Sequence, residues 1–372
     1  MSKTFRATAI LVGTTIGAGI FGIPYVISKV GFLPGIFYIL ILGLLTLLLN
    51  LVYGEIILRT PGDHQLTGYG KIYLKKAGRI LAILSLFLTI YGALLAYLIK
   101  VGEFLRLFFG FGNSYLLSIL FFIFVTIAIV FGLRTISFLE GLIVFLLVGL
   151  VSLLAILGFG KIDFSNFSGA NLSFLFLPYG VILFALSGSS VIPEMEEILR
   201  EKPQSLKKSI IIGTLIPIFV YILFASVVFG ISGSLTSDDA VSGLRFFLPS
   251  WIVMFGALLG ILSMGSSYLS LGYVLREVWY RDFKLSKAAS LAFACIPSFV
   301  LFLLGAKNFI GIIGISGAVF GGLNGILIVS IFGRAIKKSR KKPAYSLNIP
   351  KILIIILFLI FCLGIISPFL KF

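Results

Sequence analysis

Histidine, cysteine and charge are scarce in this sequence. His64 is the only histidine, Cys295 and Cys362 are the only cysteines, and charged residues make up 12% of the 372 residues, against about 25% in an ordinary soluble domain. A single histidine leaves little for Ser-His or metal catalysis, and two cysteines within apolar runs indicate neither a disulfide framework nor a metal site. A chain so poor in charge does not cover a water-facing surface, which excludes a soluble enzyme and makes a membrane-embedded enzyme a remote alternative.

Long apolar runs are what the sequence has instead. Hydrophobic residues make up 59% and the mean hydropathy is +1.18. Runs of about 20 apolar residues are the length that an α-helix needs to cross a bilayer. We therefore predict an all-α polytopic membrane protein of about eleven transmembrane helices, a multi-pass protein of the cell (plasma or inner) membrane. The runs lie at about 7–29, 33–58, 80–102, 115–133, 136–159, 173–198, 209–231, 250–275, 287–305, 309–333 and 351–370.

The basic residues fall mostly on one side of these spans. With the N-terminus in the cytoplasm, 23 of the 30 lysines and arginines lie in cytoplasmic segments, Arg134 and Arg340 among them. The other 7, which include Lys100 and Lys371, lie on the other side. This excess predicts a cytoplasmic N-terminus and a C-terminus outside. It also accounts for the net charge of +17 without a nucleic-acid partner. The stretch 334–342 is a stop-transfer flank on this interpretation, with contact to anionic lipid as the alternative.

Two runs carry the same interruption 169 residues apart. Pro24 aligns with Pro193, and Gly19 then aligns with Gly188. Five helices separate the two copies, and an odd number inserts the second copy upside down. We therefore expect one transporter domain over residues 1–335, built from inverted repeats at about 7–159 and 173–333. Residues 336–372 add a basic cytoplasmic loop and an eleventh helix.

Clustered glycine and serine before a proline weaken a helix, since glycine costs about 1 kcal/mol and proline about 3 kcal/mol in a helix interior. Lipid gives no hydrogen bonds to the freed backbone groups. Broken helices in matching positions of two halves are therefore typical of a transporter binding site. Close helix packing through small residues is the alternative interpretation.

The interrupted runs resemble those of a known superfamily, the amino acid–polyamine–organocation transporters, and within it the amino acid/auxin permease and aromatic amino acid permease branches. The resemblance covers roughly residues 5 to 335. It implies the five-plus-five inverted-repeat fold of the leucine transporter, with helices 1 and 6 broken, and transport of an amino acid driven by Na⁺ or H⁺. The residues that carry it are Ile16–Phe21 (IGAGIF), Leu177–Gly188 with Ile192–Glu194, Gly92–Tyr97, Ser266–Gly272 and Leu275–Glu277.

The substrate site follows from half-helix ends and from this resemblance. A helix N-terminus offers unpaired N–H groups and a partial positive charge, so the amides of Ala18, Gly19 and Ile20 suit a substrate carboxylate. The resemblance implies that carbonyls of Thr15, Phe184 and Ser187 receive the ammonium group, that Phe184 covers the substrate and that Tyr97 lies beside it. Packing is the alternative for Tyr97. The complete candidate set is Thr15, Gly17, Ala18, Gly19, Ile20, Tyr97, Phe184, Ala185, Ser187 and Gly188.

The resemblance also implies a cation site between helices 1 and 8. Hydroxyls of Ser263, Ser266 and Ser267 would join carbonyls of Gly13 and Ile16, and such hard oxygen ligands suit Na⁺. Serines bonded to their own helix are the alternative. Some proton-coupled relatives carry a lysine on helix 5, whereas residues 136–159 contain no lysine or arginine, which favours Na⁺ over H⁺.

Few acidic residues lie at membrane depth. Glu194 is a candidate proton carrier, although an acid after a proline is also an ordinary helix start. Glu55 is a candidate gate or salt-bridge residue. We expect Glu103, Asp238 and Asp239 to be solvated at the outer surface.

Together these features predict a secondary active amino acid transporter, a cation-coupled symporter that works by alternating access and needs no cofactor beyond Na⁺ or H⁺. An exchanger or facilitator without ion coupling is the alternative. The amino acid, the direction of transport and the oligomeric state are left open by the sequence.

Overall fold

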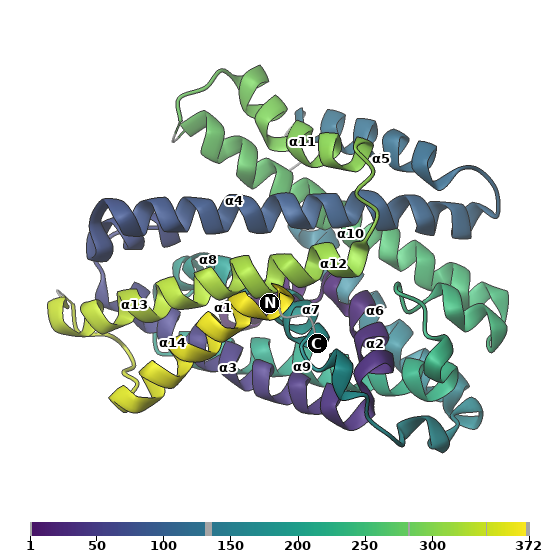
Figure 1. Cartoon of the computed structure of the whole chain (residues 1–372). Coiled ribbons are helices and arrows are strands. Elements are labelled where there is room, and N and C mark those ends of the chain that lie inside the picture. The colour runs from purple at the N-terminus through teal and green to yellow at the C-terminus, as the bar shows by residue number, and fades with distance from the viewer. Residues whose placement is uncertain (1, 131–135, 282, 340, 370–372) are drawn as a thin grey trace.

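The computed structural model of this chain describes residues 2–130, 136–281, 283–339 and 341–369, and every regular element within them is helical (Figure 1). Arg134, Arg340 and Lys371 of the charge count, and the ends of the predicted runs 115–133 and 351–370, lie outside the described residues. The α-helices are α1 (Lys3–Thr15), α2 (Gly19–Val30), α3 (Phe32–Arg59), α4 (Leu66–Phe109), α5 (Ser114–Val130), α6 (Ile136–Gly158), α7 (Leu177–Ala185), α8 (Ile192–Ile198), α9 (Ser205–Ser232), α10 (Ser250–Arg281), α11 (Lys287–Leu303), α12 (Phe309–Ile315), α13 (Gly322–Lys338) and α14 (Lys351–Ile366). Shorter turns are η1 (Phe159–Lys161), η2 (Phe164–Phe167), η3 (Leu172–Phe174), η4 (Ser189–Val191), η5 (Gly233–Leu235), η6 (Ser242–Phe246), η7 (Ser316–Gly321) and η8 (Ser367–Phe369).

The helices have the length and composition of membrane spans. Among the described residues, seven stretches are long and apolar enough to cross a bilayer, the bent pair α1–α2 makes an eighth, and three shorter apolar helices lie at 114–130, 145–161 and 287–303. The prediction of about eleven spans is therefore confirmed.

The first and sixth spans are each interrupted where the sequence predicted it. In the first span α1 and α2 meet at an angle of 52° across a short break. In the sixth span α7 ends at Ala185, and a non-helical stretch and the turn η4 precede α8. Proline stands early in α8, at Pro193, where its missing N–H costs no hydrogen bond.

The third span is longer than predicted. The apolar run suggested 80–102, but α4 extends from Leu66 to Phe109 with one non-helical residue, Lys75, at φ 60°. The residues before the apolar run alternate polar and apolar side chains, and a hydropathy window does not register such a segment. A positive φ is uncommon for a residue with a side chain, and the exposed Lys75 marks a kink between two helical parts of α4.

The tenth span contains an irregular turn that the sequence did not reveal. Residues 316–321 form a π-helical turn between α12 and α13, and the carbonyl of Phe320 within it accepts a hydrogen bond from Ser85 on α4 at 3.0 Å. Gly317 lies so close to the backbone of α7 that a Cβ there would be 1.9 Å from the carbonyl oxygen of Gly180. Glycine is therefore required where η7 meets the first half of the sixth span.

Two long helices hold these interrupted spans in place. α4 runs the length of the molecule, with α5 and α11 on one side and α12 and α13 on the other (Figure 1). α9 packs against α1, α2 and α3. The first break is therefore set against α9, and the irregular turn η7 of the tenth span is set against α4.

Candidate functional site

The first break buries the motif that the sequence singled out. α1 ends at Thr15, the capping residue Ile16 has a non-helical backbone, and α2 begins at Gly19. All residues from Thr15 to Ile20 are buried, and Gly13 is half-buried within α1. The N-terminus of α2 brings a partial positive charge to this break. Of the amides predicted to bind a carboxylate, that of Ile20 already donates to the carbonyl of Gly17 at 3.4 Å.

The second break lies directly against the first. A Cβ at Gly19 would be 2.4 Å from Cα of Ala185, and a Cβ at Gly188 would be 2.3 Å from Oγ1 of Thr15. Such approaches leave no room for any side chain larger than glycine. The structure thus brings together Thr15, Gly19, Ala185 and Gly188, which the sequence assigned to one substrate site.

A tyrosine of the seventh span joins the two breaks, and sequence reasoning missed it. The hydroxyl of Tyr221 on α9 lies 2.6 Å from the carbonyl oxygen of Thr15 and 2.8 Å from that of Ala185. These are the last residues of α1 and α7, whose carbonyls lack helical partners. The Thr15 carbonyl also accepts the N–H of Gly17 at 2.9 Å. A substrate ammonium at Thr15 would therefore compete with two existing donors.

The remaining predicted substrate residues lie around this junction. Phe184 is half-buried at the end of α7, and its carbonyl accepts the N–H of Ser187 at 3.1 Å. Ser187 is exposed, and its hydroxyl donates to the carbonyl of Leu183. Tyr97 is buried on α4, close enough to Tyr221 for the two phenols to interact electrostatically. The substrate assignments of these residues stay predictions.

Of the three serines predicted to bind a cation, Ser267 comes nearest to the first break. A Cβ placed on Gly17 would be 3.7 Å from Oγ of Ser267, so this half-buried hydroxyl faces the break. Ser266 donates instead to the carbonyl of Ser263, within its own helix, at 3.0 Å. Ser263 is buried. Hence only Ser267 has a described position beside the break, and its role as a cation ligand stays a prediction.

The two acidic candidates lie in different surroundings. Glu194 is exposed in the first turn of α8, beyond the second break. Glu55 is completely buried and bonds Arg59 at 2.6 Å and the backbone N–H of Leu347 at 2.6 Å. Ser346 donates to the same carboxylate at 3.1 Å. These contacts fasten the segment between α13 and α14 to α3 and favour the salt-bridge role for Glu55.

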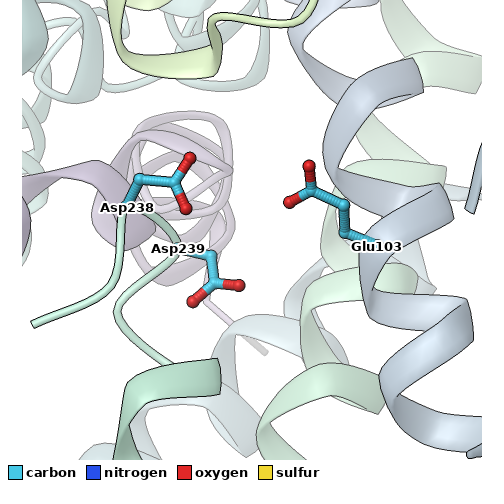
Figure 2. Close-up of side chains that lie close together, drawn as sticks. All are labelled: Glu103, Asp238 and Asp239. Atoms are coloured by element: carbon cyan, nitrogen blue, oxygen red, sulfur yellow. The ribbon is translucent and has the colours of Figure 1, made fainter.

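A buried lysine of α4 bonds an acidic residue of the loop between α9 and α10, a contact that the sequence did not predict. Lys100 on α4 is 1% exposed, and its ammonium lies 2.5 Å from Glu103 and 2.7 Å from Asp238. Figure 2 shows the carboxylates of Glu103, Asp238 and Asp239 gathered between α4 and this loop. Asp239, expected to be solvated, is 4% exposed and accepts hydrogen bonds from the N–H groups of Val241 and Ser242.

The three acids have the spacing of a cation site, since their oxygens lie within 4.8 Å of one another. The ammonium of Lys100 already bonds two of them, so a metal ion there would meet a fixed positive charge. The expectation of a solvated acidic surface was wrong for Asp239, because its carboxylate turns back into its own loop and accepts hydrogen bonds from Ser237, Val241 and Ser242.

A polar cavity of about 330 Å³ lies beside the second half of the sixth span. Its lining includes Thr60 and His64 near the end of α3, Glu196 and Glu197 on α8, and Lys341. Arg200 and Asp63, also in the lining, form an exposed ion pair at 2.7 Å. The cavity thus gives α8 a polar face that includes Glu196 and Glu197.

Comparison with known proteins shows what this chain is similar to. The sequence model of the tryptophan/tyrosine permease family matches residues 1–368. The chain is 26% identical over 384 residues to "Tyrosine-specific transport system 1" of Haemophilus influenzae, covering 96% of this chain and 95% of the relative. It is 22% identical over 339 residues to "Glutamine transporter 2" of Aliivibrio fischeri, covering 85% of each. The solved structure of MhsT in complex with L-phenylalanine superposes with a TM-score of 0.68 at 15% identity, covering 99% of this chain and 98% of MhsT.

Proposed function

Because this chain belongs to the tryptophan/tyrosine permease family, and is therefore an amino acid transporter of the leucine-transporter-like fold and no enzyme, we propose that it carries aromatic L-amino acids by cation-coupled symport. Tyrosine and tryptophan are the proposed substrates, Na⁺ is the proposed coupling ion, and H⁺ is second to it. We place the N-terminus in the cytoplasm, on the excess of basic residues there.

The observation that supports the proposal most is the direct contact of the two breaks. The carbonyl ends of α1 and α7 share the hydroxyl of Tyr221, and Gly19, at the start of α2, lies against the backbone of Ala185. A zwitterion needs a positive partner for its carboxylate and oxygen acceptors for its ammonium, and this junction supplies both from backbone atoms. Backbone groups recognise what all amino acids share, so the side-chain preference must come from the residues around them.

The proposal of Na⁺ rests on a hydroxyl and on a missing positive charge. Ser267 faces the first break, where its oxygen would join carbonyls of Gly13 and Ile16 around a hard cation. Residues 136–158, which form the fifth span, contain no lysine or arginine to replace the ion. Ion and substrate would then share one break, so that each stabilises the geometry that the other binds.

Uptake into proteoliposomes tests the proposal directly. The full chain is reconstituted and given radiolabelled tyrosine, tryptophan, phenylalanine or glutamine under an inward Na⁺ gradient, an inward proton gradient or neither. We expect accumulation of tyrosine and tryptophan above the medium only with the Na⁺ gradient. Accumulation driven by protons alone would replace Na⁺ by H⁺, and a preference for glutamine would overturn the substrate class.

A counterflow experiment separates symport from exchange. Vesicles preloaded with unlabelled tyrosine and free of ion gradients should exchange label transiently in either case. Net uptake into empty vesicles, however, requires a symporter or facilitator. Label that enters only preloaded vesicles would show that the chain is an exchanger.

A further inference from the structure

The hydroxyl of Tyr221 is the one described side-chain group that bonds both broken spans at once. It reaches the carbonyl of Thr15, the last residue of α1, and that of Ala185, the last residue of α7. Tyr221 is 0% exposed, so this hydrogen-bonded junction lies inside the helix bundle. The two carbonyls belong to residues 170 positions apart in the sequence. The sequence of either break gives no sign that a side chain of a third helix joins them.

One proton serves two acceptors at this point. A phenol donates a single hydrogen bond, yet two carbonyl oxygens lie within 2.8 Å of its oxygen. Thr15 has a second donor, the N–H of Gly17 at 2.9 Å. The hydroxyl hydrogen of Tyr221 can therefore turn toward the carbonyl of Ala185 without leaving that of Thr15 unbonded. Because the two carbonyl oxygens share one hydrogen-bond donor, a small displacement of either helix end changes which of them the hydroxyl bonds.

The helix that carries Tyr221 packs closely against the first span. α9 extends over 28 residues without a break, although Pro217 stands one turn before Tyr221, and it contacts α1, α2 and α3. One turn after Tyr221, Phe224 meets Phe21 of α2 edge to face with ring centroids 6.4 Å apart. Tyr221 thus lies on a helix without a break, while both of its partners belong to interrupted spans.

We propose that Tyr221 is a positioning residue of the transport cycle, whose hydroxyl holds the ends of α1 and α7 at one point and so transmits a movement of either half-span to the other. The inference rests on the proposed transport function, in which these half-spans bind the substrate. Tyr221 acts through the two backbone carbonyls, and its removal loosens the site without removing a backbone group that contacts substrate.

Tyr221→Phe deletes only the hydroxyl, and the chain offers a matched control. Tyr345 is also a buried tyrosine, and its hydroxyl donates to the carbonyl of Leu51 at 2.7 Å, away from both breaks. Tyr345→Phe therefore also removes a phenol–carbonyl hydrogen bond, but the Leu51 carbonyl lies inside α3 and keeps its helical partner. We expect Tyr221→Phe to lose at least as much thermal stability as Tyr345→Phe, so loss of stability alone does not show a positioning role.

Two measurements on the purified full chain do distinguish them. The first is the distance between spin labels on cysteines introduced at Phe5, exposed on α1, and at Leu172, exposed shortly before α7, in a background in which Cys295 and Cys362 are replaced by alanine. Tyr221→Phe should broaden the distance distribution without any substrate, and Tyr345→Phe should leave it as in the parent. An unchanged distribution in Tyr221→Phe would overturn the inference.

The second measurement is the equilibrium binding of labelled tyrosine. A lost hydrogen bond corresponds to about a 3- to 10-fold loss of affinity, expected for Tyr221→Phe and absent for Tyr345→Phe. Equal affinity in Tyr221→Phe and the parent would count against a positioning role. If the parent binds no aromatic amino acid, the proposed substrate class fails, while the label distances still decide whether Tyr221 joins the two spans.

Discussion

The ion cluster around Lys100 predicts an asymmetry between variants that remove the base and variants that remove the acids. Lys100 is 1% exposed, whereas Glu103 and Asp238 are 41% and 45% exposed. Lys100→Met leaves two carboxylates that water can solvate. The double variant Glu103→Gln with Asp238→Asn leaves an ammonium that water does not reach.

The magnitudes follow from these exposures. A half-exposed pair contributes about 0–1 kcal/mol, and the contact of Lys100 with the ring of Phe309 at 5.1 Å adds about 1 kcal/mol, so Lys100→Met should cost about 1–2 kcal/mol. An uncompensated buried charge costs about 3–5 kcal/mol. The double acid variant should lose about 3 kcal/mol, because the negative charge of Asp239 still lies near the ammonium. The triple variant, which combines Lys100→Met, Glu103→Gln and Asp238→Asn, should be no less stable than Lys100→Met alone.

Thermal unfolding of the four purified proteins in one detergent checks this order, at low and at high salt. High salt should change the parent little, because a buried ammonium is poorly screened. If Lys100→Met is destabilised as much as the double acid variant, the ammonium is hydrated in the native protein and the reasoning from burial is refuted. A triple variant less stable than the double variant would refute it as well.

Three further predictions concern the breaks and the α3 anchor. Gly17→Ala places its methyl group at ordinary contact distance from Ser267 and should fold with parental stability, whereas Gly19→Ala drives a Cβ into the backbone of α7 and should lose about 1–3 kcal/mol or more; thermal unfolding of both compares them, and equal stabilities would contradict the contact between the breaks. Ser267→Ala should raise the Na⁺ concentration for half-maximal uptake about 10-fold, equivalent to about 1.4 kcal/mol, with near-normal uptake at saturating Na⁺; an equal loss at every Na⁺ concentration would indicate packing instead. Glu55→Gln should cost about 1.5–3 kcal/mol, the scale of a hydrogen bond to a charged group, and should speed amide exchange at Leu347, which the carboxylate holds; slow exchange there in the variant would show that other contacts anchor the segment.

The sequence carried enough local information to predict the breaks. Glycine and proline act on the backbone within a turn of where they stand, so Gly19, Pro24, Gly188 and Pro193 mark the interruptions without reference to any other helix. Span number follows in the same way, because hydropathy is a sum over neighbours in the chain. Amino acid transport came from a resemblance of motifs, which the match over residues 1–368 confirms.

Features that depend on two distant segments were not predicted. Lys100 was counted only among the basic residues of the non-cytoplasmic side, and its burial with Glu103 and Asp238 as partners was not foreseen. The π-helical turn at 316–321 has no residue that requires it locally; its Phe320 carbonyl is satisfied by Ser85 of another span. In each case the local cost is offset by a group more than 100 residues away, which composition and periodicity do not record.

Tyr221 shows how far a bottom-up argument could have gone. A helix that ends inside the bilayer leaves carbonyls that lipid does not satisfy, so two such ends require donors from elsewhere in the protein. Among residues of the long apolar spans, the candidates are the few that carry an N–H or O–H and lie near mid-length, and Tyr221 is one, at the middle of the 28-residue α9. The need for a donor was therefore deducible from the breaks alone, and only its identity required the structure. An unexplained hydroxyl midway along an apolar span is, on the same reasoning, a sign that another span is broken beside it.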